Sequence, residues 1–253
     1  MSKSILEIPD DFPLSERQRI ACTSVQTGQA WFSAELGKEL ESLKYPLYFM
    51  DFESVNPAIP RFSGMRPFDQ LPFQWSVHVQ QQPDSELEHY EFLATDNSDP
   101  RREFIHSLCG ALGESGSIAV YAAFESQRLT ELAAWLPEFS EQTKRIRGRL
   151  WDLLPIVRDN LYHPQFAGSY SLKSVLPALV PELTYEGMTV ANGQDAGVAW
   201  ERLIRRNLEQ TERECIREAL LDYCGQDTLA MVKLVAKLRS ISTNLYDAVN
   251  HGS

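Results

Sequence analysis

The sequence predicts an α/β domain with a mixed central sheet flanked by helices, and three features support that prediction. The apolar run Leu47–Ser54 is typical of a buried strand, although it contains two acids. Residues 73–80 alternate apolar and polar side chains, as a strand does. Apolar residues recur at helical spacing through residues 216–238. With 253 residues, 43% of them hydrophobic, the chain can bury the core of one large domain.

Each further element follows from a local pattern. We expect a polar arm at 8–15 and a helix-like segment at 16–43 before the buried strand, and a loop rich in Pro and Gly at 56–72 after it. Strands at 73–80 and 89–93 then form an antiparallel meander with the buried strand, followed by a helix from 99 to 113, a short strand at 117–122 and a helix at 124–132. Another helix opens at 168–176, and the final third of the chain is helical. These elements divide the chain into an N-terminal arm and helix (1–44), a main domain (45–240) and a C-terminal tail (241–253).

Asp51 and Glu53 lie two residues apart near the end of the buried strand. Successive side chains of a strand point to opposite sides, so these two carboxylates share one face. Two unpaired carboxylates at one buried spot would repel each other and resist desolvation. A bound divalent cation explains why both are present, and the chemistry we expect is metal-assisted phosphodiester hydrolysis.

Two other segments place chemistry-bearing side chains at defined positions. Tyr223 and Asp227 are four residues apart on the last helix, so they stand on one face about one turn apart. Glu125 sits where the strand at 117–122 passes into the next helix. An acid pair on a first strand, an acid after a later strand and a Y-x-x-x-D helix resemble, in that order, the three motifs of the DEDDy branch of the DnaQ-like 3′–5′ exonucleases.

That resemblance spans roughly residues 45–240 and implies a ribonuclease H-like (DnaQ-like exonuclease) fold. The chain resembles more closely the DUF2779 domain, an uncharacterised bacterial family within that superfamily. The supporting stretches are Tyr48–Glu53, Asn56–Phe62, Pro72–Ser76, Gly168–Lys173 and Tyr223-Cys224 with Asp227. Proteins with this domain often carry a Cas4- or RecB-like nuclease part before it. This chain looks like the exonuclease-like domain alone, so such a part would be a separate or fused partner.

The resemblance also assigns roles residue by residue. Asp51 would bridge two divalent ions, while Glu53 and Asp227 would hold the ion that activates water. Tyr223 would orient or deprotonate that water. The two metals would stabilise the attacking and leaving oxygens during in-line displacement. Oxygen ligands favour Mg²⁺ or Mn²⁺ over Zn²⁺.

The second motif departs from the family pattern, which has an aspartate where this chain has Glu125. The longer side chain could hold the second metal directly, hold it through a water, or serve as an outer ligand. Asp152 is the rival candidate, because related exonucleases carry an acid there that is not a metal ligand. We favour Glu125. Taken alone, each acid could be a cap or a salt-bridge partner, and Tyr223 could be a core residue. Taken together and in this order, these residues favour an active site. His78 and His89, on predicted strands, are interpreted as satisfied polar positions and not as ligands.

The charge balance limits the partners that we expect. The formal net charge is -11, with 24 Lys and Arg against 35 Asp and Glu, which disfavours extended duplex binding. Single-stranded nucleic acid or a short oligonucleotide remains compatible, because bound metals supply positive charge. The clusters Arg145–Arg149 and Arg202 with Arg205-Arg206 could line a phosphate path, but we favour a solvated surface for each. In the loop, Phe62 and Phe68 could stack on a terminal base, and Arg61 and Arg66 could contact phosphates.

The longest apolar stretches, such as Ile118–Phe124, are far too short to span a bilayer, and no apolar signal segment follows Met1–Ser4. We expect no membrane partner, a cytoplasmic location and four reduced cysteines, none in a C-x-x-C pair. The predicted function is a metal-dependent 3′–5′ exonuclease on single-stranded DNA or RNA. The alternatives are a catalytically inactive nucleic-acid- or partner-binding domain and an endonuclease on structured substrates.

Overall fold

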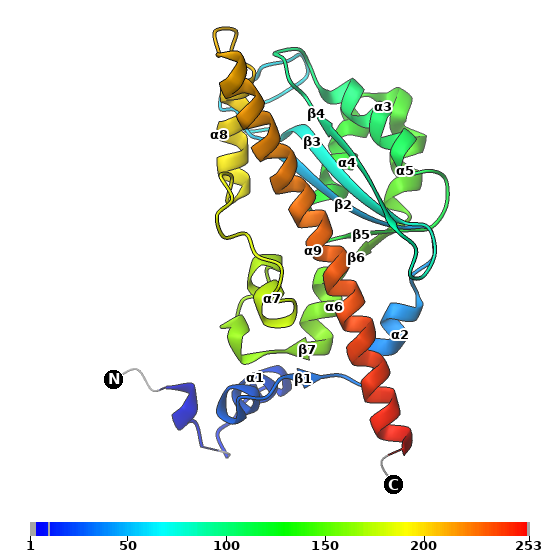
Figure 1. The fold of residues 1–253 in the computed structure, drawn as a ribbon, viewed down its shortest axis with the longest axis vertical. Helices are drawn as coiled ribbons and strands as arrows, with labels where there is room; N and C mark the ends of the chain where they lie inside the picture. Colours follow the sequence, from blue (N-terminus) through cyan, green and yellow to red (C-terminus); the bar gives the residue numbers. More distant parts are fainter. Residues whose placement is uncertain (1–3, 10, 252–253) are drawn as a thin grey trace. The chain divides into compact units, whose positions relative to one another are not determined.

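The computed structural model describes residues 4–9 and 11–251, and Figure 1 traces its elements. The chain forms two compact units. The sheet unit comprises Leu43–Asp152 and Tyr185–Val232 and holds every predicted site residue. The second unit comprises the chain up to Ser42, Leu153–Thr184 and the chain from Lys233 onward. The predicted domain boundaries at 44/45 and 240/241 rest on sequence patterns, whereas these two units group residues that are close in space. The boundaries therefore remain a prediction.

The sheet unit is built on five strands in the order β4-β3-β2-β5-β6. Their bounds are β2 Leu47–Val55, β3 Leu71–Gln80, β4 Leu87–Leu93, β5 Ser117–Val120 and β6 Leu150–Asp152. β2, β3 and β4 pair antiparallel, as the predicted meander requires, whereas β5 pairs parallel with β2 and β6 parallel with β5. The prediction of a mixed α/β sheet flanked by helices is confirmed.

Helices cover both faces of this sheet (Figure 1). On one face, α3, α4 and α5 pack on a core that includes Met50, Phe52 and Val77. On the other face, α8 and the first part of α9 pack on Val55, Leu71 and Phe73. The bounds are α3 Arg101–Ala111, α4 Phe124–Trp135, α5 Ser140–Arg147, α8 Gly193–Leu203 and α9 Gln210–His251, with the 3-10 turn η2 at Pro137–Phe139.

The polar face of β3 explains how α9 is held on the sheet. Alternate residues of the strand reach the helix: Gln74 Nε2 donates to Leu220 O at 2.7 Å, and Ser76 and His78 each contact Thr228 Oγ1 at 2.8 Å. Because these groups are buried or partly buried, each bond offsets a desolvation cost. The polar positions of the predicted alternating strand therefore face a helix and not solvent.

The second unit contains shorter elements, namely η1 Ile5–Glu7, α1 Glu16–Thr27, β1 Trp31–Phe32, α2 Leu36–Glu41, α6 Leu153–Asn160, β7 Leu161–Tyr162, η3 Pro164–Phe166 and α7 Leu172–Leu179. β1 and β7 form a two-stranded antiparallel sheet. The helix-like segment predicted over 16–43 contains two helices, α1 and α2, and the strand β1 between them. Ser15 caps α1 through its side chain, and the helix ends at Gly28, whose φ of 69° is the left-handed conformation that glycine tolerates. The chain then extends into β1 before α2 begins.

The terminal helix is confirmed and continues past residue 240 to His251, within the segment predicted as a tail. No helix in the described part of the chain combines the length and the apolar character that crossing a bilayer requires.

Candidate metal centre

Three carboxylates meet where β2 passes under α9. Asp51, Glu53 and Asp227 each offer one oxygen, and these three atoms lie within 4.8 Å of one another. Glu53 and Asp227 are buried, at 6% and 8% exposure, and Asp51 is partly buried. The structure thus brings together three of the four acids that the sequence proposed as metal ligands.

The local structure of β2 sets this geometry. Strand alternation places Asp51 and Glu53 on the face opposite Met50 and Phe52, which lie in the core under α3 and α4. Both carboxylates therefore point toward the side of the sheet that carries α8 and α9. The β2–β3 register shifts only after the second acid, between Glu53 and Ser54, where Phe73 of β3 has no partner on β2.

Glu125 stands outside the group of three but contacts it. It lies in the first turn of α4 with 1% exposure, and its carboxyl group shares a hydrogen bond with Asp51. Burial and the charge of Asp51 raise the pKa of Glu125 well above its usual range. Glu125 is therefore the protonated donor of this pair. Its Oε2 is buried without a hydrogen-bond partner.

Burial also raises the pKa of Asp51, with the charge of Asp227 acting in the same direction, while the hydrogen bonds from Glu125 and Cys224 lower it. The Cys224 thiol lies 3.8 Å from Asp51 Oδ2. Burial raises the pKa of that thiol well above its ordinary value, so it stays neutral. The donors that remain for a metal are carboxylate oxygens.

Asp152, the rival of Glu125, is used differently. It ends β6, and its Oδ1 accepts a hydrogen bond of 2.8 Å from the Ala122 backbone N–H. Ala122 has a φ of 77°, in the left-handed region, within the turn that connects β5 to α4. Asp152 thus stabilises the turn that carries Glu125 and lies outside the group of three acids.

Two tyrosines surround Asp227. Tyr223, one helical turn earlier and 3% exposed, hydrogen bonds to the Asp227 carboxylate. Tyr185 Oη donates to Asp227 Oδ1 at 2.5 Å. Burial and the neighbouring carboxylates raise the pKa of both phenols, so both are hydrogen-bond donors at neutral pH. Sequence reasoning missed Tyr185, which lies far from Asp227 along the chain and within no motif.

Helix α8 lies close to the acid cluster because two of its residues are glycines, which have no Cβ atom. A Cβ at position 193 would lie 3.3 Å from Glu53 Oε2, and one at position 197 would lie 3.0 Å from Val55 Cγ1. The two positions are four apart on one helical face. On its buried side, Trp200 stacks on Phe73 with ring centroids 4.7 Å apart. Sequence analysis did not single out these residues, although glycine at i and i+4 in a helix is a signal of close packing.

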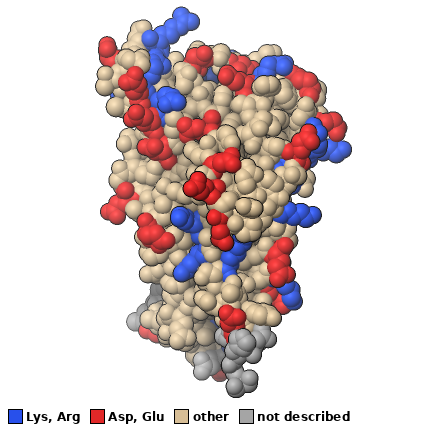
Figure 2. Space-filling view, turned by 45° about the vertical axis from the view of Figure 1, so that its right-hand side comes forward, with Lys and Arg blue, Asp and Glu red and all other residues tan. Residues whose placement is uncertain are grey.

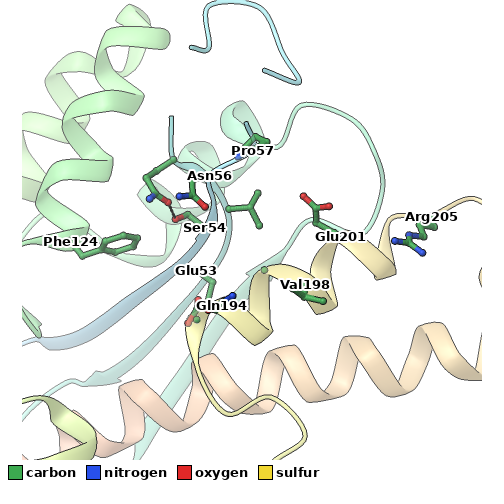
Figure 3. Close-up of a pocket in the computed structure, with 13 residues that line it drawn as sticks. Glu53, Ser54, Asn56, Pro57, Phe124, Gln194, Val198, Glu201 and Arg205 are labelled. Atoms are coloured by element: carbon green, nitrogen blue, oxygen red, sulfur yellow. Dashed lines mark hydrogen bonds between the residues drawn. The ribbon is translucent and has the colours of Figure 1, made fainter. Parts of the chain in front are cut away.

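A groove of about 720 Å³ opens beside Glu53 (Figure 3). Its lining comes from the end of β2, the loop between β2 and β3, the start of α4, one face of α8 and the segment after it, namely Glu53, Ser54, Val55, Asn56, Pro57, Gln70, Phe124, Gly193, Gln194, Gly197, Val198, Glu201 and Arg205. Glu53 therefore connects the acid cluster to a surface groove.

The residues predicted to contact nucleic acid include a basic cluster at 145–149 and the aromatic residues of the loop after β2. Arg149, from the first basic cluster, donates to the backbone oxygens of Leu112, Gly113, Ser115 and Gly116, so it is a structural residue and not part of a phosphate path. In the loop, Phe68 is 66% exposed with a φ of 66°, whereas Phe62 is partly buried. On the face drawn in Figure 2, acidic and basic side chains of the described residues are interspersed, with no continuous basic stripe.

The two histidines of the neighbouring strands, His78 and His89, are satisfied polar residues. Their rings stack with centroids 4.2 Å apart, and each bonds a hydroxyl, His78 to Thr228 and His89 to Ser76, both at 2.8 Å. Burial lowers the pKa of both rings, that of His78 to about 4.

The chain is similar to three curated proteins whose names assign no function. The chain is 26% identical over 226 residues to "Uncharacterized protein MG366 homolog" of Mycoplasma pneumoniae, covering 81% of this chain and 34% of that protein. It is 27% identical over 222 residues to "Uncharacterized protein MG366" of Mycoplasma genitalium, covering 79% and 33%. It is 26% identical over 214 residues to "Uncharacterized protein UU173" of Ureaplasma parvum, covering 75% and 31%. The chain thus spans about a third of the length of the curated relatives that it matches.

No solved structure gives a significant match. The model for "Domain of unknown function (DUF2779)" matches residues 48–171. The match includes Asp51, Glu53 and Glu125 and ends before Tyr223 and Asp227. The predicted resemblance to DUF2779 is confirmed over these residues.

Proposed function

We propose that the protein is a metal-dependent 3′–5′ exonuclease that hydrolyses phosphodiester bonds of single-stranded DNA or RNA. The observation that carries the proposal is the convergence of Asp51, Glu53 and Asp227 within 4.8 Å, with Tyr223 on Asp227. The acids come from a strand and from a helix far later in the chain. Three carboxylates gathered at such low exposure repel one another and resist desolvation, and a bound divalent cation would offset both costs.

The residues present fit a divalent cation. The donor set is all oxygen, which suits Mg²⁺ or Mn²⁺, and the buried Glu125 Oε2 has no hydrogen-bond partner. Asp51, Glu53 and Asp227 would hold the metal, and Glu125 would be a further ligand after losing the proton that it shares with Asp51. When bound, two such ions would supply the positive charge that stabilises attacking and leaving oxygens at the scissile phosphate.

The chain's own groups would do the remaining work. Tyr185 holds one oxygen of Asp227, which fixes the orientation of that carboxylate. Tyr223, protonated and buried beside Asp227 and Glu53, is suited to donate a hydrogen bond to a reacting oxygen or to orient a water. The raised pKa of its phenol favours orientation over deprotonation.

The ribonuclease H-like, DnaQ-like identity of the fold belongs to the same proposal. It is supported by three antiparallel strands followed by two parallel ones, with the acids near the end of the central strand β2. The order of the acid pair Asp51 and Glu53, then Glu125, then Tyr223 with Asp227 along the chain also supports this fold assignment.

One observation favours the inactive alternative. Glu125 replaces the aspartate of the second motif and hydrogen bonds to Asp51, so the pair is stabilised by a shared proton without any metal. In that case the groove beside Glu53 would bind nucleic acid or a partner without cleavage.

The test is incubation of the purified protein with 5′-labelled single-stranded DNA and RNA in Mg²⁺, Mn²⁺ or EDTA, beside the Asp51→Ala, Asp227→Ala double variant. We expect a metal-dependent ladder that shortens from the 3′ end and is absent in the variant. A folded protein that cleaves neither polymer with either metal supports the inactive alternative. Cleavage at internal sites from the first time points would instead indicate an endonuclease.

A further inference from the structure

The groove beside the acids leads to a second cavity that is basic. This cavity, of about 570 Å³, is lined by Arg61, Phe62, Asn97, Glu201, Ile204, Arg205 and Arg206. Glu201 and Arg205 line both cavities, so the two are adjacent at the end of α8. Three arginines from two distant segments thus meet here in a protein of net charge -11.

The charges in this cavity do not cancel. Arg61 forms an ion pair with Glu201 at 2.7 Å, and its guanidinium lies over the Trp200 ring at 5.4 Å from the centroid. Arg61 is thereby held in place and neutralises the only acid of the lining. The side chains of Arg205 and Arg206 form no ion pair within the described residues. The lining keeps two uncompensated positive charges.

Helix α8 begins beside Glu53 and ends just before Arg205 and Arg206. Gln194, Val198 and Glu201 recur at spacings of four and three on one face of α8, and Arg205 lies two residues past Leu203, where the helix ends. Figure 3 shows Val198 and Glu201 on α8 and Arg205 beyond them, away from Glu53 and Phe124. The 11 residues of α8 span about 16 Å at about 1.5 Å per residue.

We propose that Arg205 and Arg206, with Arg61 engaging the acid Glu201 beside them, form a phosphate-binding subsite for the single strand beyond its reacting end. This inference rests on the proposed function, because it takes Glu53 and its neighbours as the position of the scissile phosphate. At about 3.4 Å per stacked nucleotide, the distance corresponds to about five nucleotides. The preferred substrate is therefore an oligonucleotide of that length or longer, and a dinucleotide is a poor one.

The groove between the two ends suits bases of any sequence. Val198, which is 66% exposed, and Phe124 offer apolar surface on opposite walls. The lining includes no arginine or lysine other than Arg205. Base contacts of this kind are sequence-tolerant, whereas the phosphate contacts at the far end supply the salt-dependent affinity.

The first test measures binding and needs no hydrolysis. Fluorescence anisotropy of 5′-fluorescein (dT)10 is followed in EDTA over a range of salt concentrations. The proteins compared are the wild type, Arg205→Ala/Arg206→Ala, and the control Arg145→Ala/Arg147→Ala, which removes two exposed arginines of α5 outside both cavities. We expect the subsite variant to bind about tenfold more weakly. Its slope of log K against log salt should fall by about 1.4, at about 0.7 for each lost phosphate contact. The control should match the wild type.

Equal affinity and slope in the wild type and the subsite variant would overturn the proposal. So would an equal loss in the control, or a wild type that does not bind (dT)10 at low salt. A second test compares kcat/KM for (dT)10 and (dT)2 with Mn²⁺. The ratio should fall about tenfold in the subsite variant. If the wild type hydrolyses neither, the exonuclease proposal fails while the binding comparison still decides the subsite.

Discussion

The substitution Asp51→Asn should stabilise the protein without metal and abolish its response to metal. The ligand oxygens of Asp51, Glu53 and Asp227 lie within 4.8 Å of one another. Two ionised carboxylates at that separation repel by about 3.5 kcal/mol at an effective dielectric constant of about 20. Burial raises the pKa of Asp51 to about 8, so the carboxylate is ionised in about half of the molecules at pH 8, where we expect a gain of about 2 kcal/mol. The amide oxygen introduced by the substitution can still accept the hydrogen bond from Glu125.

This gain corresponds to a rise in Tm of roughly 4–8 °C for a chain of this size. The wild type should instead gain stability from Mg²⁺ or Mn²⁺, by about 2.7 kcal/mol when the ion is at about 100 times its Kd. The assay is calorimetry of both proteins in EDTA and in each metal. The control is Asp222→Asn, which removes an exposed charge from the same helix α9 and should change stability by less than about 0.5 kcal/mol.

Two results would refute this reasoning. If Asp51→Asn is destabilised in EDTA, the carboxylate is a structural hydrogen-bond acceptor and not a strained ligand. If the variant keeps the full metal-dependent rise in Tm, the ion binds elsewhere.

Three further outcomes are expected. Tyr223→Phe should lower kcat about 100-fold with a smaller change in KM, because it removes a donor at the centre and keeps the ring; an unchanged kcat in a 3′-end ladder assay would exclude the tyrosine from the chemistry. Asp152→Ala should cost about 1–2 kcal/mol in urea denaturation, because it leaves the Ala122 N–H without its acceptor at a φ of 77°; a wild-type midpoint would show that the turn holds itself. The lowered pKa of His78, about 4 against an ordinary 6.5, favours the neutral ring in the folded state. The contribution of His78 to the free energy of unfolding is therefore complete above pH 6.5 and lost as the pH falls toward 4. The loss should be on the order of 2 kcal/mol after allowing for partial exposure. Urea denaturation at several pH values should show a smaller loss of stability in His78→Gln than in the wild type.

The predictions that succeeded from sequence depend on local periodicity. Alternation along β2 is a property of any strand, so the shared face of Asp51 and Glu53 followed from their spacing. The same holds for Tyr223 and Asp227 on a helix, whose spacing of four sets one turn. The helix-like segment expected over 16–43 is divided because a single glycine in a left-handed conformation at position 28 outweighed the helical pattern around it.

The sequence alone determined four of the five strands of the central sheet, the terminal helix and the two local pairs of side chains, since each depends on spacing over a few residues; the short strand β6 was not predicted. Only the tertiary structure decided that the two pairs meet, that Asp152 supports the turn at Ala122, and that Tyr185 holds Asp227. It also brought Arg61 beside Arg205 and Arg206. These outcomes depend on contacts between segments far apart in the chain, which arise from the pairing of β6 with β5 and from the packing of α8 and α9 on the sheet. Local spacing carries no information about either.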